Sequence, residues 1–95
     1  MFFTYILYSE KTDKYYIGHT SDLQLRIARH NDGWSKSTKS GIPWRIVYCE
    51  EYETKFQAMS REYEIKRKKS RIFIEKLVES AEGRPEVIRE VLSLP

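Results

Sequence analysis

The sequence predicts one α+β domain, with a small three-stranded, mainly antiparallel sheet flanked by helices. Two segments rich in aromatic and β-branched residues, 2–8 and 14–18, are typical of strands and are separated by a short polar turn. Residues 45–52 have the same composition and predict a third strand. Helical patterns separate and follow these segments, so the expected order is strand, strand, helix, strand and three helices.

The first helix is expected directly after the hairpin. Asp22 or Ser21 can cap its N-terminus, and Leu23 and Ile27 form an apolar stripe one turn apart. The sequence Asn-Asp-Gly at 31–33 is a typical helix end. Residues 34–44 are then rich in Ser, Lys, Gly and Pro, which predicts a surface loop whose length suggests a binding role.

The second helix is expected to follow the third strand and to run to about Arg67. Thr54 and Gln57 have the spacing of a capping box. The apolar stripe that we expect to face the core consists of Phe56, Met59 and Tyr63.

The C-terminal part predicts two more helices. Ser70 can cap a helix through about Ser80, with Ile72 or Phe73, and then Leu77, facing inward. Residues 81–95 predict a last short helical extension with a proline in its first turn. No repeat or linker divides the chain, so residues 1–95 are expected to form a single domain.

Composition limits the class of protein. The net charge is +3 and the pI is about 9.0, and eight basic residues against three acidic ones lie between Lys55 and Lys76. No apolar run approaches the roughly 20 residues of a membrane span, and the start of the chain lacks the features of a secretory signal. A lone cysteine in an apolar run, Cys49, predicts a buried thiol. We therefore expect a cytoplasmic protein with no membrane partner and a preference for anionic ligands.

Several polar side chains that could take part in catalysis are predicted to converge. Arg26 and His30 lie one turn apart on the first helix, next to its apolar stripe. Glu62 lies at the margin of the expected stripe of the second helix, where a carboxylate can be half buried. Tyr5 and Tyr16 come from neighbouring strands, and their hydroxyls complete the cluster if they face these helices.

These residues resemble the motifs of the GIY-YIG nucleases. Tyr16, Ile17 and Gly18 match the second family triplet, and Phe3, Thr4 and Tyr5 stand in place of the first, keeping only its tyrosine. Arg26 follows Tyr16 by ten residues, as in the family, and His30 matches a position that the family fills with histidine or tyrosine. The stretch QAMSREYEIKR resembles the second helix motif and selects Glu62, rather than Glu64, as the metal-binding glutamate.

The resemblance covers about residues 2–75. It is specifically to small standalone members of the family, and to the N-terminal nuclease domain found in the excision-repair endonuclease. It implies a metal-dependent endonuclease that hydrolyses DNA phosphodiester bonds, with DNA repair or the processing of structured DNA as the expected setting. One divalent ion, Mg²⁺ or Mn²⁺, would be bound by Glu62.

The resemblance also implies roles for the other motif residues. Arg26 would bind the non-bridging phosphate oxygens through its planar fork of donors, and Tyr5 would pack around the scissile phosphate. Gly18 would allow a close backbone approach or a turn. The group that accepts the proton of water stays open among Tyr16, His19 and His30, since an unperturbed phenol titrates near pH 10 and histidine near 6.5.

Basic and aromatic residues outside the motifs are candidates for DNA contacts. Trp34 and Trp44 flank the 34–44 loop and either anchor it to the core or stack on a base. The lysines and the arginine expected to contact the DNA backbone are Lys36, Lys39, Lys66, Arg67, Lys68 and Lys69.

Two departures from the family pattern define the rival hypotheses. The glycine and isoleucine of the first triplet are replaced by Phe3 and Thr4, and the asparagine that larger members carry beyond the metal glutamate is absent from KRKKSRIFIEK. The alternative function is therefore a non-catalytic nucleic-acid-binding module on the same scaffold. A third hypothesis is a protein-interaction domain whose acidic last helix docks a partner.

Overall fold

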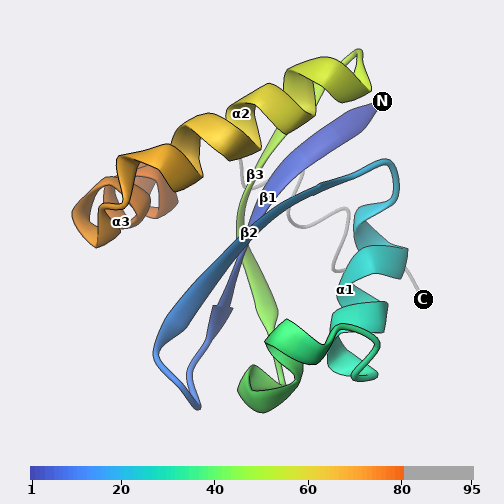
Figure 1. The fold of residues 1–95 in the computed structure, drawn as a ribbon, viewed down its shortest axis with the longest axis vertical. Helices are drawn as coiled ribbons and strands as arrows, with labels where there is room; N and C mark the ends of the chain where they lie inside the picture. Colours follow the sequence, from blue (N-terminus) through green and yellow to red (C-terminus); the bar gives the residue numbers. More distant parts are fainter. Residues whose placement is uncertain (81–95) are drawn as a thin grey trace.

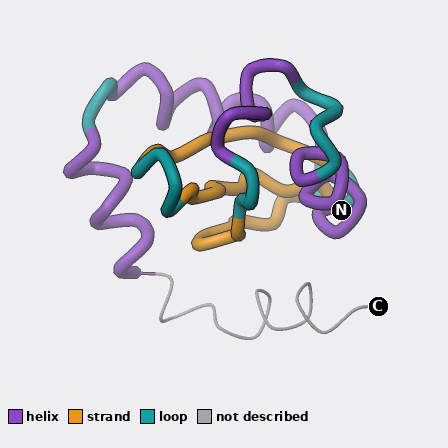
Figure 2. Tube along the Cα trace, turned by 90° about the horizontal axis from the view of Figure 1, so that it is seen from below, coloured by secondary structure: helices purple, strands orange, loops and turns teal. Residues whose placement is uncertain are grey.

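Strand β1 is the centre of a three-stranded antiparallel sheet with the order β2-β1-β3 in the computed structural model, which describes residues 1–80 (Figures 1 and 2). The predicted fold class is confirmed. The elements are β1 (Phe2–Ser9), β2 (Lys14–Thr20), α1 (Leu23–Asn31), the 3₁₀ helix η1 (Lys36–Gly41), β3 (Arg45–Tyr52), α2 (Lys55–Lys68) and α3 (Arg71–Ser80). The helix expected over 81–95 lies outside the described residues.

The two faces of the sheet carry separate apolar clusters, because successive side chains of β1 point in opposite directions. On one face, here called the α1 face, Tyr5 and Leu7 pack with Leu23 of α1 and with Trp44. On the opposite α2 face, Ile6 packs with the residues Ile17, Tyr48 and Ile65, with side chains of α3 against them. Figure 1 shows α1 on one side of the crossing strands and α2 with α3 on the other.

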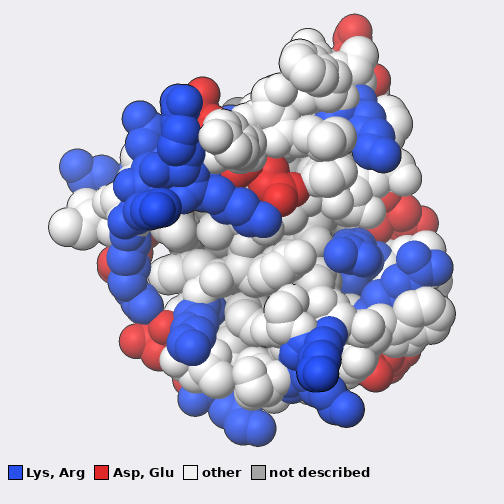
Figure 3. Space-filling view, viewed as in Figure 1, with Lys and Arg blue, Asp and Glu red and all other residues white. Residues whose placement is uncertain are grey.

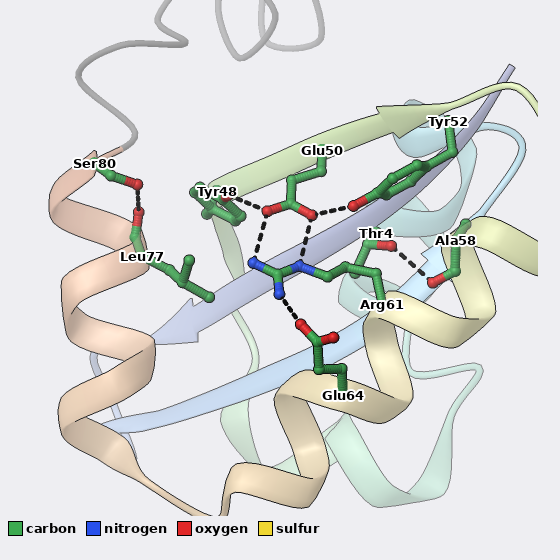
Figure 4. Close-up of polar contacts among 9 residues, drawn as sticks. All are labelled: Thr4, Tyr48, Glu50, Tyr52, Ala58, Arg61, Glu64, Leu77 and Ser80. Atoms are coloured by element: carbon green, nitrogen blue, oxygen red, sulfur yellow. Dashed lines mark hydrogen bonds and ion pairs between the residues drawn. The ribbon is translucent and has the colours of Figure 1, made fainter.

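The inward face of α2 differs from the prediction. Phe56, Met59 and Tyr63 are 78%, 46% and 66% exposed, and the buried residues of this helix are Ala58 and Ile65. The small side chain of Ala58 lets the helix backbone come close to the sheet, where its carbonyl accepts a 2.8 Å hydrogen bond from the buried Thr4 hydroxyl of β1 (Figure 4). The apolar stripe was therefore the wrong indicator of which face packs.

The polar residues Arg61 and Glu62 lie on the side of α2 that faces the sheet. Each finds a partner there: Arg61 pairs with Glu50 of β3, and Glu62 pairs with His19 of β2. A polar side chain can be buried when it is paired and hydrogen-bonded, so these ion pairs allow the face with Ala58 and Ile65 to pack inward.

Gly18 provides a close approach within β2, rather than a turn at the end of the strand. It pairs with Tyr5 across the hairpin, and a Cβ on it would lie 2.5 Å from the Tyr5 hydroxyl oxygen. Because the glycine has no side chain, the hydroxyl end of the Tyr5 ring lies close to the β2 backbone. This contact sets the position of the phenol.

The predicted helix ends are confirmed by local hydrogen bonds. Asp22 caps α1 by accepting from the Leu25 amide, and Gly33, with φ of +81°, follows its C-terminus. Thr54 and Gln57 form the capping box of α2. The hydroxyl of Ser70 accepts from the Phe73 amide at the start of α3. Of the two alternatives for the inward position, Phe73 packs against the core and Ile72 is 68% exposed.

Trp44 anchors the predicted 34–44 loop. Its buried indole nitrogen donates a 2.6 Å hydrogen bond to the Thr38 carbonyl, and the Asn31 side chain bonds both backbone polar groups of Trp44. Trp34, by contrast, is 71% exposed, with the Arg29 guanidinium over its ring. Anchoring is therefore the role of Trp44, and base stacking stays a prediction for Trp34.

Two further sequence expectations concern the cysteine and membrane-spanning helices. Cys49 is buried, as expected. Within residues 1–80, each helix is too short or too polar to cross a membrane.

Candidate active site

Tyr5 is fully buried and lies at the centre of a polar cluster on the α1 face. Its hydroxyl oxygen lies 3.0 Å from Nε2 of His30 and accepts a 3.3 Å hydrogen bond from Nε of Arg26. Arg26 and His30 lie one turn apart on α1, so one side of this helix brings both groups to the phenol. The expected convergence of these three residues is present.

The hydrogen bonds around His30 have one consistent direction. The Thr38 hydroxyl of η1 donates to the Ser35 carbonyl, so its oxygen accepts from Nδ1 of His30, 2.9 Å away. Nε2 is then the unprotonated ring nitrogen and accepts from the hydroxyl of Tyr5. A neutral imidazole of this tautomer links η1 to Tyr5 and, through Tyr5, to Arg26.

Burial controls the protonation of this cluster. Desolvation, together with the charge of Arg26, lowers the pKa of His30 from its ordinary value of 6.5. Burial raises the pKa of Tyr5 to about 12, although the hydrogen bond from Arg26 opposes the shift. The same hydrogen bond is the main reason that the pKa of Arg26 is raised. At neutral pH the cluster therefore consists of a neutral phenol, a neutral imidazole and a guanidinium cation.

A second cluster, around Glu62, lies on the α2 face. Its Oε1 is 2.6 Å from Nδ1 of His19 on β2, and its Oε2 is 2.6 Å from Nζ of Lys66, one turn later on α2. Burial would raise the pKa of Glu62, but the hydrogen bonds from Lys66 and His19 outweigh burial and lower it below its ordinary value. Glu62 is thus an ionised, mostly buried carboxylate with cationic or polar groups on both oxygens.

Tyr16 joins the two clusters around the edge of the sheet. Its ring centroid lies 4.8 Å from that of His30 and 6.3 Å from that of Tyr5, on the α1 face. Nζ of Lys66 lies 5.9 Å from the Tyr16 ring centroid, although Lys66 belongs to the helix on the α2 face. Because β2 is an edge strand, a long side chain can reach around it. Lys66 therefore links the two clusters at this edge even though α1 and α2 cover opposite faces.

The described residues fit a metal ion held by few protein ligands. Within residues 1–80, no three side chains of the His, Cys, Asp and Glu types are close enough to hold a metal together. Mg²⁺ keeps most of its waters and needs only one or two carboxylates, so Glu62 alone is compatible with it. Oε2 of Glu62 already binds one cation, the Lys66 ammonium. The Lys66 side chain is 48% exposed and so has room to move away.

The predicted basic residues separate into three groups in the structure. Lys66 and Lys69 line a groove beside β2, whereas Arg67 and Lys68 lie over the rings of Tyr63 and Phe73. Lys36 and Lys39 are exposed on η1, at the other end of the candidate site. Figure 3 shows Lys and Arg side chains gathered near the junction of α2 and α3, with further groups over the α1 and η1 side.

A comparison of the sequence with protein-family models identifies the domain that carries these residues. Residues 1–76 match the model of the GIY-YIG catalytic domain, a range that includes both tyrosines, Arg26, His30 and Glu62. The chain belongs to the GIY-YIG family. This is a nuclease family whose members generally depend on metal ions, and the domain implies DNA as the substrate.

Its relatives are small members of the GIY-YIG family. The chain is 40% identical over 77 residues to the UPF0213 protein YazA of Bacillus subtilis, an alignment that covers 77% of the chain and 78% of that protein. It is 48% identical over 52 residues to UPF0213 proteins of Staphylococcus aureus, covering 54% of the chain and 63% of theirs. The solution NMR structure of the UPF0213 protein BH0048 from Bacillus halodurans has a TM-score of 0.54, with 35% identity and full coverage of both chains.

One departure from the GIY-YIG triplets has a structural explanation. Thr4, in place of the isoleucine, is buried and uses its hydroxyl to bind the carbonyl of Ala58 on α2. This bond ties β1 to α2, so the threonine has a structural role in this chain.

Sequence reasoning missed Thr38 as part of the GIY-YIG site. This residue is buried and bonds His30, but it lies in a Ser- and Lys-rich segment with no helical or strand periodicity. The contact depends on how η1 folds back onto α1, which spacing along the chain does not encode. The hydrogen bonds of Asn31 and Trp44 hold this segment in place, but they do not point to Thr38.

Proposed function

We propose that this chain is an endonuclease that hydrolyses DNA phosphodiester bonds with the help of Mg²⁺ or Mn²⁺, in DNA repair or in the processing of structured DNA. The observation that carries the proposal is the arrangement of Arg26, Tyr16 and Glu62 around the edge strand β2, where Nζ of Lys66 lies 2.6 Å from Oε2 of Glu62 and 5.9 Å from the Tyr16 ring centroid. These residues come from α1, β2 and α2, and they combine a guanidinium, a phenol and a carboxylate. That set can bind a phosphate, accept a proton and hold a cation.

Arg26 is the group that binds the phosphate of the substrate. Its Nε is held by the hydroxyl of Tyr5, so the orientation of the guanidinium is set before the substrate arrives. Its remaining N–H groups can donate to two phosphate oxygens at once. Tyr5, held in turn by His30, acts as a positioning residue for Arg26.

Tyr16 and His19 are better placed than His30 to accept the proton of the attacking water. His30 is 1% exposed, and both of its ring nitrogens are engaged by Tyr5 and Thr38. The side chain of His19 is 29% exposed and contacts the candidate metal ligand Glu62, and Tyr16 is partly exposed. The ion held by Glu62 would stabilise the negative charge that develops on the phosphate oxygens.

A cleavage assay tests the proposal. Supercoiled plasmid and branched, flapped and single-stranded oligonucleotides are incubated with the protein in Mg²⁺, Mn²⁺ or EDTA. Cleavage should require the metal and fall by about a hundredfold or more in Glu62→Gln and in Arg26→Gln. Glu64→Gln is the matched control for the first, since Glu64 lies on the same helix and pairs with Arg61. Arg45→Gln, on an exposed arginine, is the control for the second. If Glu62→Gln cuts as well as the wild type, the metal assignment is wrong.

A second candidate function is a nucleic-acid-binding module without catalysis. The observation that favours it is the engagement of both Glu62 oxygens, by His19 and Lys66, which leaves the carboxylate already neutralised. Such a module would bind all the DNA substrates in the assay and cut none of them with either metal. Metal-dependent cleavage by the wild type would exclude it.

A further inference from the structure

A basic groove lies where α2 ends, α3 begins and β2 starts. Its volume is about 350 Å³. Apolar side chains that include Tyr15 and Ile74 line part of its wall, and its cationic residues are Lys14, Lys66, Lys69 and Arg71. Among residues 1–80, the side chains that line the groove include no acidic one. A concave surface with apolar and cationic portions suits a ligand that has both an apolar body and negative charge.

The basic residues of this groove differ in whether an acidic side chain pairs with them. Within the part of the chain that the structure describes, Lys14 and Lys69 have no acidic side chain at ion-pair distance. Arg71 is held by Asp13, 2.6 Å away, and its guanidinium lies 5.1 Å from the Tyr15 ring centroid. Arg71 therefore shapes the wall, and the two lysines are the groups with charge available for an anion.

The groove and the candidate active site share Lys66. This residue lines the groove, and its ammonium contacts Glu62 and lies over the ring of Tyr16. A ligand that extends from the Arg26 and Glu62 region along β2 therefore enters the groove next. Ser70 and Arg71, at the start of α3, bring the positive end of a helix dipole to the same place.

We propose that this groove binds the DNA backbone immediately beside the bond that is cut, with Lys14 and Lys69 on the flanking phosphate. The apolar wall, including Tyr15, would pack against the deoxyribose. The inference rests on the proposed function for the identity of the ligand and extends it to residues outside the family motifs. It also divides the predicted basic run: Lys66 and Lys69 face the DNA strand, and Arg67 and Lys68 do not.

Fluorescence anisotropy with a labelled oligonucleotide, in EDTA so that nothing is cut, tests the groove. The double variant Lys14→Gln with Lys69→Gln is compared with Arg67→Gln with Lys68→Gln. Both remove two positive charges, but Arg67 and Lys68 lie over Tyr63 and Phe73 and do not line the groove. Circular dichroism melting confirms that each variant is folded.

The groove variant should bind about tenfold more weakly than wild type at about 0.1 M salt. The slope of log K against log salt should become shallower by about 0.9 on duplex DNA, because the two lysines share one phosphate. The matched control should stay within about threefold of wild type. Equal losses of DNA affinity in both double variants would mean that only the net charge of the protein matters. Unchanged affinity of the groove variant would show that DNA does not enter the groove. Either result would overturn the proposal.

A cross-link tests independently where the DNA backbone lies relative to the groove. Because Cys49 is buried, Lys69→Cys provides a single exposed thiol for a photoactivatable label. The label should react within a few nucleotides of the cut on a substrate that the wild type cleaves, and reaction only at distant positions would contradict the proposed path. If no substrate is cleaved but the groove variant alone loses affinity, the endonuclease proposal fails, while the assignment of the groove to the DNA backbone stands.

Discussion

At the scale of single residues, the carboxylate of Glu62 is shared between an imidazole and an ammonium group. Nζ of Lys66 lies 2.6 Å from Oε2, one of the two oxygens that could hold a divalent ion. A tethered ammonium and a metal ion compete for the same negative charge. Binding of the ion would release Lys66 toward the groove, where the DNA backbone is proposed to lie.

The competition predicts that Lys66→Met binds Mn²⁺ more tightly than wild type does. A half-exposed ion pair contributes about 0.5 to 1 kcal/mol, which corresponds to a roughly twofold to fivefold gain in affinity. Isothermal titration calorimetry of the protein without DNA measures the effect. Lys68→Met removes the same charge without touching Glu62 and should leave the affinity unchanged. Weaker Mn²⁺ binding by Lys66→Met would contradict the competition.

The direction of the hydrogen bonds at His30 also gives a residue-scale prediction. At pH 7.5 the ring should be neutral, with its proton on Nδ1, because Thr38 offers an acceptor and Tyr5 a donor. Long-range ¹H–¹⁵N NMR spectra distinguish the two tautomers. Thr38→Val keeps the side-chain shape, removes the acceptor and should weaken this tautomer preference. A proton found on Nε2 in the wild type would reverse the assigned direction.

At the scale of elements, a largely buried ion pair ties α2 to β3. Arg61 donates to both oxygens of Glu50 on β3, at 2.8 and 3.1 Å, and the hydroxyls of Tyr48 and Tyr52 donate to the same carboxylate (Figure 4). Burial would raise the pKa of Glu50, but these donors, Arg61 foremost, lower it. The next residue along the helix is Glu62, so the clamp to β3 also orients the candidate metal ligand toward β2.

Breaking this clamp should destabilise the protein. Arg61→Met leaves Glu50 buried without its cation, and a buried charge that loses its partner costs about 3 kcal/mol. Urea unfolding followed by circular dichroism measures the change in the free energy of unfolding. Glu64→Ala removes only the exposed partner of Arg61 and should cost less than about 1 kcal/mol. Equal losses for the two variants would show that the Glu50 pair is not the stabilising one.

At the scale of the whole molecule, the burial of His30 couples stability to pH. Its pKa is lowered in the folded state, so between pH 6.5 and that lower value the unfolded chain binds more protons than the folded one. The free energy of unfolding is then highest above pH 6.5 and falls as the pH drops through this range. The lowered carboxylate pKa values of Glu50 and Glu62 act at lower pH, below their ordinary value of 4.5.

Urea unfolding at a series of pH values from about 7.5 to 5.5 checks this coupling. Wild-type stability should decline toward acid, and His30→Gln, which cannot take up a proton, should show a shallower decline. Parallel profiles for the two proteins would mean that another group is responsible for the slope.

The sequence predicted the parts of the fold that depend on local chemistry. The hairpin, the caps at Asp22, Thr54 and Ser70, and the helix end at Gly33 are all present, because each is decided within a few residues. The position of the polar face of α2 was not predictable in this way. It depends on Glu50 and His19, which are distant in the sequence and are brought under α2 only by the strand order.

The sequence by itself determined the fold class and the family, since strand composition, capping and motif spacing are all properties of the chain. Only the tertiary structure decided that α1 and α2 lie on opposite faces, that Lys66 reaches around the edge strand to Tyr16, and that Thr38 holds His30. These contacts join residues on different elements. Their existence depends on packing and on partners for buried charge, and local sequence pattern specifies neither.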